Sequence, residues 1–312
     1  MIQLWVMGAQ RVFDRSPRVL QNEPTALFEK RPTRDVPFQH RLSSFMMKFD
    51  PRTLRKTVLQ MAYAGDSVHI GCAFSLIEIV SALYGTILKY NSDNPLDPER
   101  DYLVLSKGHG IMAQYACFHE LGWIGDADIQ AYFSDGSLLH GLSESHIAGC
   151  EVTSGSLGHG LPIAVGIAKG LLLQQKEQQK VVAIVGDGEM NEGTMWESML
   201  FATHHRLHNL YVVVDANEFQ AMGKTSEVLN LEPLLDKFRA FGFETAECAG
   251  HDVDTIVRTF RGFSANAPKA LIARTWKGKG ISFMERENNW HYTRLDGADF
   301  ARALAELEGP EK

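Results

Sequence analysis

Two polar side chains that each follow an apolar run could together bind a divalent cation. Asp187 lies in the turn 186–188, Gly-Asp-Gly, after the apolar run 181–185, and Asn217 ends the next apolar run about thirty residues later. If the two runs are neighbouring parallel strands, both side chains lie at the same edge of the sheet, where such sheets bind ligands. Their oxygens suit Mg²⁺, which takes one or two side chains and completes its shell with water and phosphate.

The glycines beside Asp187 indicate that the same turn could bind a diphosphate. Gly186 and Gly188 let the backbone approach the anion, and the N-terminus of the helix that follows favours negative charge. Gly-Asp-Gly alone is also an ordinary turn after a strand. The strand before it, the helix after it and the strand-terminal Asn217 make the pattern much more specific.

The elements that must position these residues follow from apolar periodicity. Short apolar or β-branched runs predict buried parallel strands at 102–105, 181–185, 210–214 and 270–273. Apolar residues at helical spacing predict helices at 51–64, 75–88, 109–121, 126–133, 161–175, 192–207, 231–241 and 253–263. A Gly- and Ser-rich connection is expected over 134–160. This alternation predicts an α/β fold, doubly wound, with a mostly parallel sheet and helices on both faces.

The first 48 residues differ from the rest of the chain. They carry four prolines and scattered arginines without a sustained period, which predicts an irregular arm that lies on a neighbouring subunit or is a disordered leader. Residues 49–312 are expected to form one domain. Within it, Gly166 and Gly170 line one side of the helix 161–175, so close packing of that side is expected.

Composition excludes several classes of function. The chain has 312 residues and a formal net charge of −7, without a long block of one sign, so nucleic acid and membranes are not expected partners. We expect no membrane span and no secretory signal. The cysteines, Cys72, Cys117, Cys150 and Cys248, lie far apart, which predicts reduced, buried thiols in a cytoplasmic protein.

The segment from Val181 to Asn217 resembles the thiamine-diphosphate motif, and Gly-Asp-Gly-Glu-Met-Asn-Glu-Gly from Gly186 resembles its transketolase version. The resemblance covers roughly residues 50–295. It implies the thiamine-diphosphate-binding fold, with 49–312 as the diphosphate domain, and thiamine diphosphate with Mg²⁺ or another divalent cation as cofactors. The metal ligands that it implies are Asp187, Asn217 and the carbonyl of Phe219. The cofactor contacts that it implies are His109, Gly155, Leu157, Gly158, Gly186, Asp187, Gly188, Asn217, Lys277 and His291.

Other segments match family motifs in the same order along the chain. Ser67-Val-His-Ile-Gly resembles Ser-Gly-His-Pro-Gly, Leu105-Ser-Lys-Gly-His resembles Leu-Ser-x-Gly-His, and Trp290-His291 resembles the closing motif. Imidazole suits proton exchange with sugar hydroxyls, because its ordinary pKa is near neutrality. The resemblance implies the catalytic candidates His69, His109, His140, His291 and Glu192, with His140 preferred over His146. Departures from the motifs, at Val68, Ile70, Leu139–Gly141 and Tyr292, all lie on the substrate side.

The family transfers two-carbon ketol units from a ketose or ketose phosphate to an aldose. No segment of this chain resembles the family's second domain, which supplies the glutamate that activates the cofactor ring. The resemblance therefore implies the N-terminal subunit of a split transketolase, active with a C-terminal partner in a heterotetramer. The alternatives are another thiamine-diphosphate transferase, such as a 1-deoxyxylulose-phosphate-synthase-like protein or a 2-oxo-acid dehydrogenase subunit, and a catalytically silent scaffold.

Overall fold

The computed structural model describes residues 49–310, so the arm predicted for 1–48 lies outside the described residues. Within 49–310 the main sheet has five parallel strands in the order β1-β2-β3-β7-β6. Its strands are β1 (Tyr102–Leu105), β2 (Val181–Gly186), β3 (Leu210–Ala216), β6 (Glu244–Ala249) and β7 (Lys269–Arg274). The four strands that were predicted are present, and the interior strand β2 is buried along its whole length.

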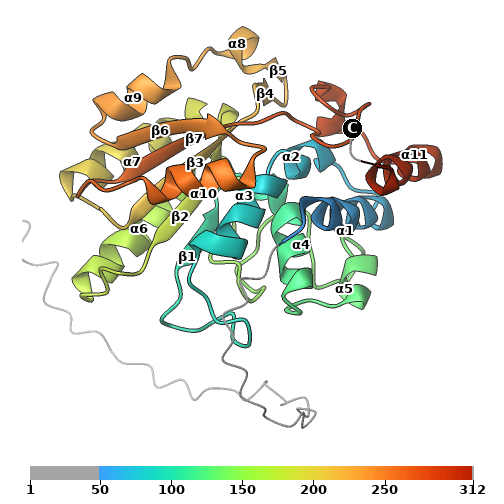
Figure 1. Ribbon diagram of the computed structural model, residues 1–312, viewed down its shortest axis with the longest axis horizontal. Helices are drawn as coiled ribbons and strands as arrows, with labels where there is room; N and C mark the ends of the chain where they lie inside the picture. Colours follow the sequence, from blue (N-terminus) through green and yellow to red (C-terminus); the bar gives the residue numbers. More distant parts are fainter. Residues whose placement is uncertain (1–48, 311–312) are drawn as a thin grey trace, which may run out of the picture. The chain divides into compact units, whose positions relative to one another are not determined.

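Alternate side chains of β1, β2, β3 and β7 enter two separate apolar clusters, which confirms that helices cover both faces of the sheet. In β2, Val182 and Ile184 join one cluster, whereas Val181, Ala183 and Val185 join the other. The helices that pack on the first face include α1 (Pro51–Ala64), α3 (Ile77–Ala82), α4 (Ile111–Glu120) and α10 (Val253–Arg261). Those on the second face are α6 (Gly160–Leu173), α7 (Gly193–His204) and α9 (Leu234–Ala240). Figure 1 shows these two layers on either side of the strands.

The start of α1 shows how local sequence determines a helix boundary. Asp50 precedes the helix, and its carboxylate accepts the backbone N–H groups of Arg52 and Thr53, both at 3.2 Å. Pro51 occupies the first turn, where its missing N–H costs nothing. The predicted helix 51–64 is therefore confirmed at both ends.

The helix predicted over 75–88 is confirmed from Ile77 to Ile87, where α3 continues directly into a π-helical turn at Leu83–Ile87. A short helix before it, α2 (Ile70–Phe74), was not predicted. Ser75 lies at the break between α2 and α3, where its hydroxyl donates to the Asp215 carboxylate at 2.6 Å. This contact joins segments far apart in the chain, so helical periodicity could not reveal it.

Several elements were not predicted. Strand β6 lies at the edge of the sheet and is partly exposed, so its sequence lacks the apolar run of a central strand. The others are helices α8 (Thr225–Val228) and α11 (Gly297–Glu308), and the antiparallel pair β4 (Phe219–Gln220) and β5 (Gly223–Lys224). The helix predicted over 126–133 is present as α5 (Asp126–Gln130), which is shorter than expected.

The side of α6 that carries Gly166 and Gly170 is open in the described chain, because a Cβ atom at either position would meet no neighbouring atom. The expectation of close packing along this side was therefore wrong within residues 49–310. The four cysteines are buried free thiols, as predicted.

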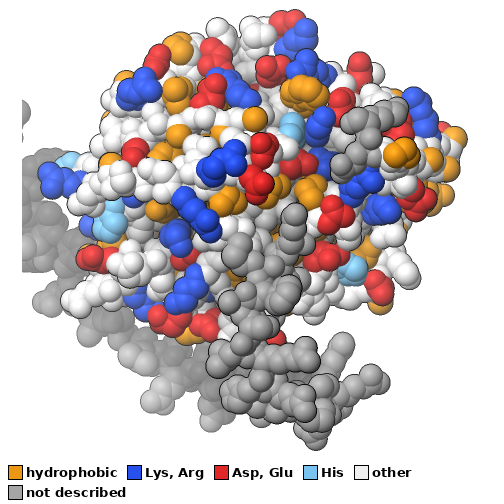
Figure 2. Space-filling model, in the orientation of Figure 1, with side chains coloured by type: hydrophobic (Ala, Val, Ile, Leu, Met, Phe, Trp, Pro, Cys, Tyr) orange, Lys and Arg blue, Asp and Glu red, His pale blue; other side chains and the backbone are white. Residues whose placement is uncertain are grey.

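The surface shown in Figure 2 mixes acidic and basic side chains instead of gathering one sign. Among the helices that the structure describes, none combines the length and apolar composition that a membrane crossing needs.

Candidate active site at the carboxyl edge of the sheet

A cavity of about 360 Å³ lies beyond the carboxyl ends of β2 and β3. The predicted site residues that line it are His69, His109, Gly155, Leu157, Gly186, Asp187, Gly188, Glu192, Asn217, Phe219 and His291. The structure thus brings together most of the residues that the sequence indicated, from segments spread between positions 69 and 291. Gly158 and Lys277 adjoin the cavity through hydrogen bonds to Glu189 and His291, which line it.

His140 is the exception among the predicted residues. It is not part of the cavity lining, its side chain is 45% exposed, and its ring pairs with the Glu144 carboxylate at 2.7 Å. His146, the alternative to His140, pairs with the same carboxylate at 3.1 Å. The structure therefore places both histidines in one exposed cluster, outside the lining of the cavity.

Asp187 is held by donors from three directions. Its Oδ1 accepts the Gly188 N–H at 2.8 Å, and its Oδ2 accepts the Glu218 N–H at 2.8 Å and the Thr225 hydroxyl at 3.2 Å. Burial and the nearby Asp215 charge raise the pKa of Asp187 to about 6, because these hydrogen bonds only partly offset the lost hydration. A cation beside this carboxylate would stabilise its charged form.

Asn217 directly follows the neighbouring strand β3 at the same edge, as predicted. In the pairing of β2 with β3, Gly186 lies opposite Asp215, so Asp187 and Asn217 follow the paired ends. The Nδ2 of Asn217 donates to Asp215 at 3.0 Å, and its Oδ1 accepts the Phe219 N–H at 3.1 Å. These two bonds fix the side-chain orientation of Asn217. No group of three or more His, Cys, Asp or Glu side chains within 49–310 is arranged as a metal site, so a cation here would need mixed ligands.

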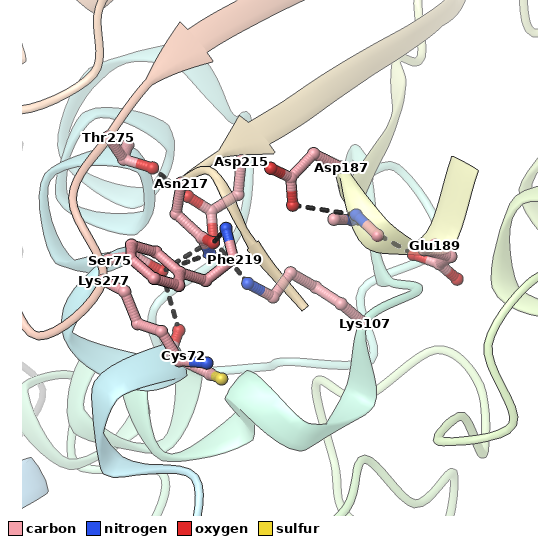
Figure 3. A network of polar contacts seen from close by, with 12 residues as sticks. Cys72, Ser75, Lys107, Asp187, Glu189, Asp215, Asn217, Phe219, Thr275 and Lys277 are labelled. Atoms are coloured by element: carbon pink, nitrogen blue, oxygen red, sulfur yellow. Dashed lines mark hydrogen bonds and ion pairs between the residues drawn. The ribbon is translucent and has the colours of Figure 1, made fainter. Parts of the chain in front are cut away.

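Sequence reasoning missed a buried ion pair next to Asn217. Asp215 is fully buried and accepts hydrogen bonds from Lys107, Ser75 and Thr275 as well as from Asn217 (Figure 3). Burial alone would raise the pKa of Asp215, but the Lys107 charge and these hydrogen bonds hold it below its ordinary value. The sequence contained an indication of this pair, because an acidic residue such as Asp215 inside an apolar strand needs a buried partner.

Glu189 is a second residue that the sequence analysis did not predict, and its carboxylate fixes the loop that contains Gly158 by hydrogen bonds. Its Oε1 accepts the Ser106 hydroxyl at 2.5 Å and the Gly158 N–H at 3.0 Å, while its Oε2 accepts the Gly186 N–H at 3.2 Å. Gly158 has a φ of +85°, and a Cβ there would lie 2.6 Å from the Cβ of Glu192. The cavity wall at this point therefore requires glycine.

Three of the four predicted histidines form one cluster in the cavity. The ring centroids of His69, His109 and His291 lie between 5.1 and 5.6 Å apart. Burial, with the charge of Lys277 next in importance, lowers the pKa of His69 to about 4 and that of His291 to about 3. Burial also holds the pKa of His109 well below its ordinary value. All three rings are therefore neutral near pH 7.

Several polar groups around the cavity are incompletely satisfied by the described residues. Lys277 is fully buried and donates to the Asn288 Oδ1 at 2.9 Å and to the His291 ring at 2.7 Å, but it has no carboxylate partner there. The Oδ1 of Asn191 and the Nε2 of Gln220 are buried without a hydrogen bond, and both residues line the cavity. Because buried polar groups are normally satisfied, this arrangement fits a polar, charged ligand.

The fold and this cavity define an α/β protein with a polar ligand site at the carboxyl edge of its sheet. A family model described as "Transketolase, thiamine diphosphate binding domain" matches residues 51–308. The chain belongs to this family, as the sequence motifs predicted.

The chain is similar over most of its length to proteins that are named as transketolase subunits. It is 38% identical over 256 residues to one subunit of the apulose-4-phosphate transketolase of Actinobacillus succinogenes, and the match covers 81% of this chain and 92% of that relative. It is 35% identical over 265 residues to the 6-deoxy-6-sulfo-D-fructose transketolase subunit SqwG of a Clostridium species, with 84% and 96% covered.

Solved structures show the same fold. The transketolase of Campylobacter jejuni superposes with a TM-score of 0.76 at 29% identity, over 82% of this chain. This chain spans only 42% of that transketolase chain.

Proposed function

We propose that this chain binds thiamine diphosphate with Mg²⁺ and is the cofactor-binding subunit of a two-subunit transketolase-like enzyme. One observation carries the proposal. A buried acid, Asp187, and a buried cation without a carboxylate partner among the described residues, Lys277, lie at the same cavity. A magnesium diphosphate would satisfy both groups, because it brings a cation to the acid and an anion to the ammonium.

The proposed metal and diphosphate contacts are those that the resemblance to the family implies. Asp187, the Oδ1 of Asn217 and the carbonyl of Phe219 are the proposed ligands of Mg²⁺. The proposed contacts to the cofactor are Gly155, Leu157, Gly158, Gly186, Gly188, His109, Lys277 and His291. These assignments are supported by the position of the residues in or beside one cavity. The glycines allow the backbone to approach the diphosphate.

The neutral histidines are the proposed proton-transfer groups. Bound thiamine diphosphate supplies a nucleophilic carbon and an electron sink for two-carbon transfer. His69, His109 and His291 would exchange protons or hydrogen bonds with the hydroxyl and carbonyl oxygens of the sugar. Glu192, which lines the cavity, is proposed to face a second copy of the chain. The same role for His140 remains a prediction, and its surface position lends it no support.

A second subunit would complete the site. The relatives named above are called subunits, and the chain exposes large apolar side chains that a lone globular protein would usually bury or scatter. Those on α6, on α7 and in the loops near the cavity are Ile163, Leu173, Leu200, Phe201, Leu142, Met222 and Tyr292. We propose that a C-terminal transketolase subunit covers part of this surface, in a heterotetramer with two copies of each chain.

A donor assay separates the proposal from its alternatives. The chain would be mixed with the candidate partner subunit, thiamine diphosphate and Mg²⁺, and supplied with apulose 4-phosphate, 6-deoxy-6-sulfo-D-fructose or pyruvate and an aldose acceptor. Two-carbon transfer from a ketose supports the proposal, whereas activity with pyruvate alone would assign another class of thiamine-diphosphate enzyme. A chain that binds no thiamine diphosphate at saturating Mg²⁺ would be a scaffold.

A further inference from the structure

The Nδ1 atom of His291 has two neighbours that carry hydrogens. The Nζ of Lys277 lies 2.7 Å from Nδ1, and the Sγ of Cys72 lies 3.5 Å from it. An ammonium group has three donors and no acceptor, and a thiol is a weak donor. Lys277 also donates to the Oδ1 of Asn288 at 2.9 Å, which orients its ammonium group between the two acceptors.

The protonation states of Cys72 and His291 are consistent with hydrogen-bond donation to the Nδ1 of His291. Burial raises the pKa of the Cys72 thiol, so that the thiol keeps its hydrogen near neutral pH. Burial lowers the pKa of His291 to about 3, so the ring is neutral and carries a single N–H. A neutral imidazole with two donors directed at Nδ1 must carry that hydrogen on Nε2.

We propose that Lys277 and Cys72 hold His291 as the Nε2–H tautomer, so that His291 presents a hydrogen-bond donor to the ligand in the cavity. His291 lines the cavity, and its Nε2 has no hydrogen bond to another described residue. The nitrogen left for a ligand is therefore the one that carries the hydrogen. Lys277 and Cys72 are positioning residues in this arrangement, because they act through the imidazole.

His69 differs from His291 in this respect. Its ring makes no side-chain hydrogen bond within residues 49–310, although it lies 5.1 Å from the His291 ring. The chain thus leaves the tautomer of His69 free and holds that of His291. A free tautomer suits a group that both accepts and returns a proton, whereas a held N–H suits a group that stabilises a negative or developing charge on oxygen.

The tautomer of His291 is a property of the isolated chain, whereas a hydrogen bond from its Nε2 to a diphosphate or sugar oxygen rests on the proposed function. The tautomer is therefore tested without cofactor, on the full chain labelled with ¹⁵N-histidine, by long-range ¹H–¹⁵N NMR near neutral pH. The His291 signals are assigned from their loss in His291→Gln. We expect a pyridine-like shift for Nδ1 and a pyrrole-like shift for Nε2.

Variants then test the cause. Lys277→Met combined with Cys72→Ala should move both ¹⁵N resonances toward the averaged position of an imidazole that exchanges between tautomers. Lys277→Arg keeps a charged donor and should retain most of the wild-type signature. Lys279→Met is the matched control, because Lys279 lies on the same loop but pairs with Glu285 at 3.1 Å.

Two results would overturn the proposal. The first is a protonated Nδ1, or an even mixture of tautomers, in the wild-type chain, which needs no variant to fold. The second is an unchanged spectrum in the double variant, which would show that other groups determine the tautomer. Failure of the chain to bind thiamine diphosphate would overturn the proposed function and leave this result standing.

Discussion

The backbone N–H of His69 donates to the carbonyl of His291 at 3.0 Å, and the two rings meet edge to face with centroids 5.1 Å apart. His69 adopts a left-handed conformation with a φ of +72°, immediately before α2. His291 lies in a 3₁₀ turn near the other end of the described chain. The first and last motifs of the site are therefore joined directly, and a shift of one ring would alter the position of the other.

Replacement of either histidine should impair turnover much more than cofactor affinity. We expect His69→Ala and His291→Ala to lower the turnover of the two-subunit enzyme by about two to four orders of magnitude, through the loss of general acid–base help from His69 and of a hydrogen-bond donor from His291. Steady-state rates and thiamine diphosphate titrations would be measured together. His119→Ala is the control, because His119 pairs with Asp126 away from the cavity. Near-normal turnover would assign that histidine a structural role.

Asp187→Ala and Asn217→Ala should each abolish Mg²⁺-dependent binding of thiamine diphosphate while the fold stays intact. The reason is that each removes a proposed metal ligand and leaves the diphosphate charge poorly compensated. Calorimetry at matched Mg²⁺ gives the affinity, and circular dichroism reports the fold. Asp236→Ala, which removes an exposed acid paired with Arg239, should bind as the wild type does. Unchanged affinity in either site variant would contradict the ligand assignment.

Gly158→Ala should destabilise the chain and weaken cofactor binding. Alanine at a φ of +85° is strained, and its Cβ would contact Glu192 at 2.6 Å and the Thr194 hydroxyl at 2.7 Å. We expect a loss of about 1–3 kcal/mol in the free energy of unfolding, measured with urea. Gly166→Ala is the matched control in the isolated chain, because its Cβ meets open space inside α6. It should stabilise the helix by about 0.5–1 kcal/mol.

The isolated chain should become less stable as the pH falls from about 6.5 to about 4. Unfolded histidine binds a proton near pH 6.5, whereas folded His69 does so only at about 4 and folded His291 at about 3. At these two sites the unfolded state therefore binds more protons in this window, so their contribution to the free energy of unfolding decreases as the pH falls. Asp187, whose folded pKa is about 6, acts in the opposite direction and offsets part of this decrease. The limiting slope is about 1.4 kcal/mol per pH unit for each histidine, and solvent around the partly exposed rings reduces it.

Urea unfolding at a series of pH values measures this slope. The double variant His69→Asn with His291→Gln cannot bind these protons, so its stability should depend less steeply on pH. Equal slopes for the double variant and the wild type would show that these rings are not held neutral by the fold.

The isolated chain should not accelerate exchange of the C2 proton of thiamine diphosphate until its partner is added. The matched motifs account for the metal, the diphosphate and the substrate hydroxyls, but no segment resembles the family's ring-activating glutamate. Exchange would be followed by NMR in deuterated buffer, with and without the candidate partner. Fast exchange in the chain alone would mean that it carries its own activating group, and the split-enzyme proposal would fail.

The edge that carries Asp187 and Asn217 could be predicted from the sequence alone. Apolar runs separated by helical segments predict parallel strands, and the carboxyl ends of such strands meet at one edge of the sheet. The pairing of Gly186 with Asp215 follows that expectation. The grouping of the histidines could not be predicted from apolar periodicity. Their motifs lie far apart, and only the resemblance to a family indicated that His69, His109 and His291 belong to one site.

Tertiary structure alone decided which side chains meet around that edge. The Lys107–Asp215 pair, the Glu189 clamp on Gly158 and the contact of Lys277 with His291 each join segments that are remote in sequence. Periodicity reports which face of an element is buried, but it carries no information about the partner across the interface. The position of a buried charge depends on that partner, so these contacts could be seen only after the strands and loops had been placed.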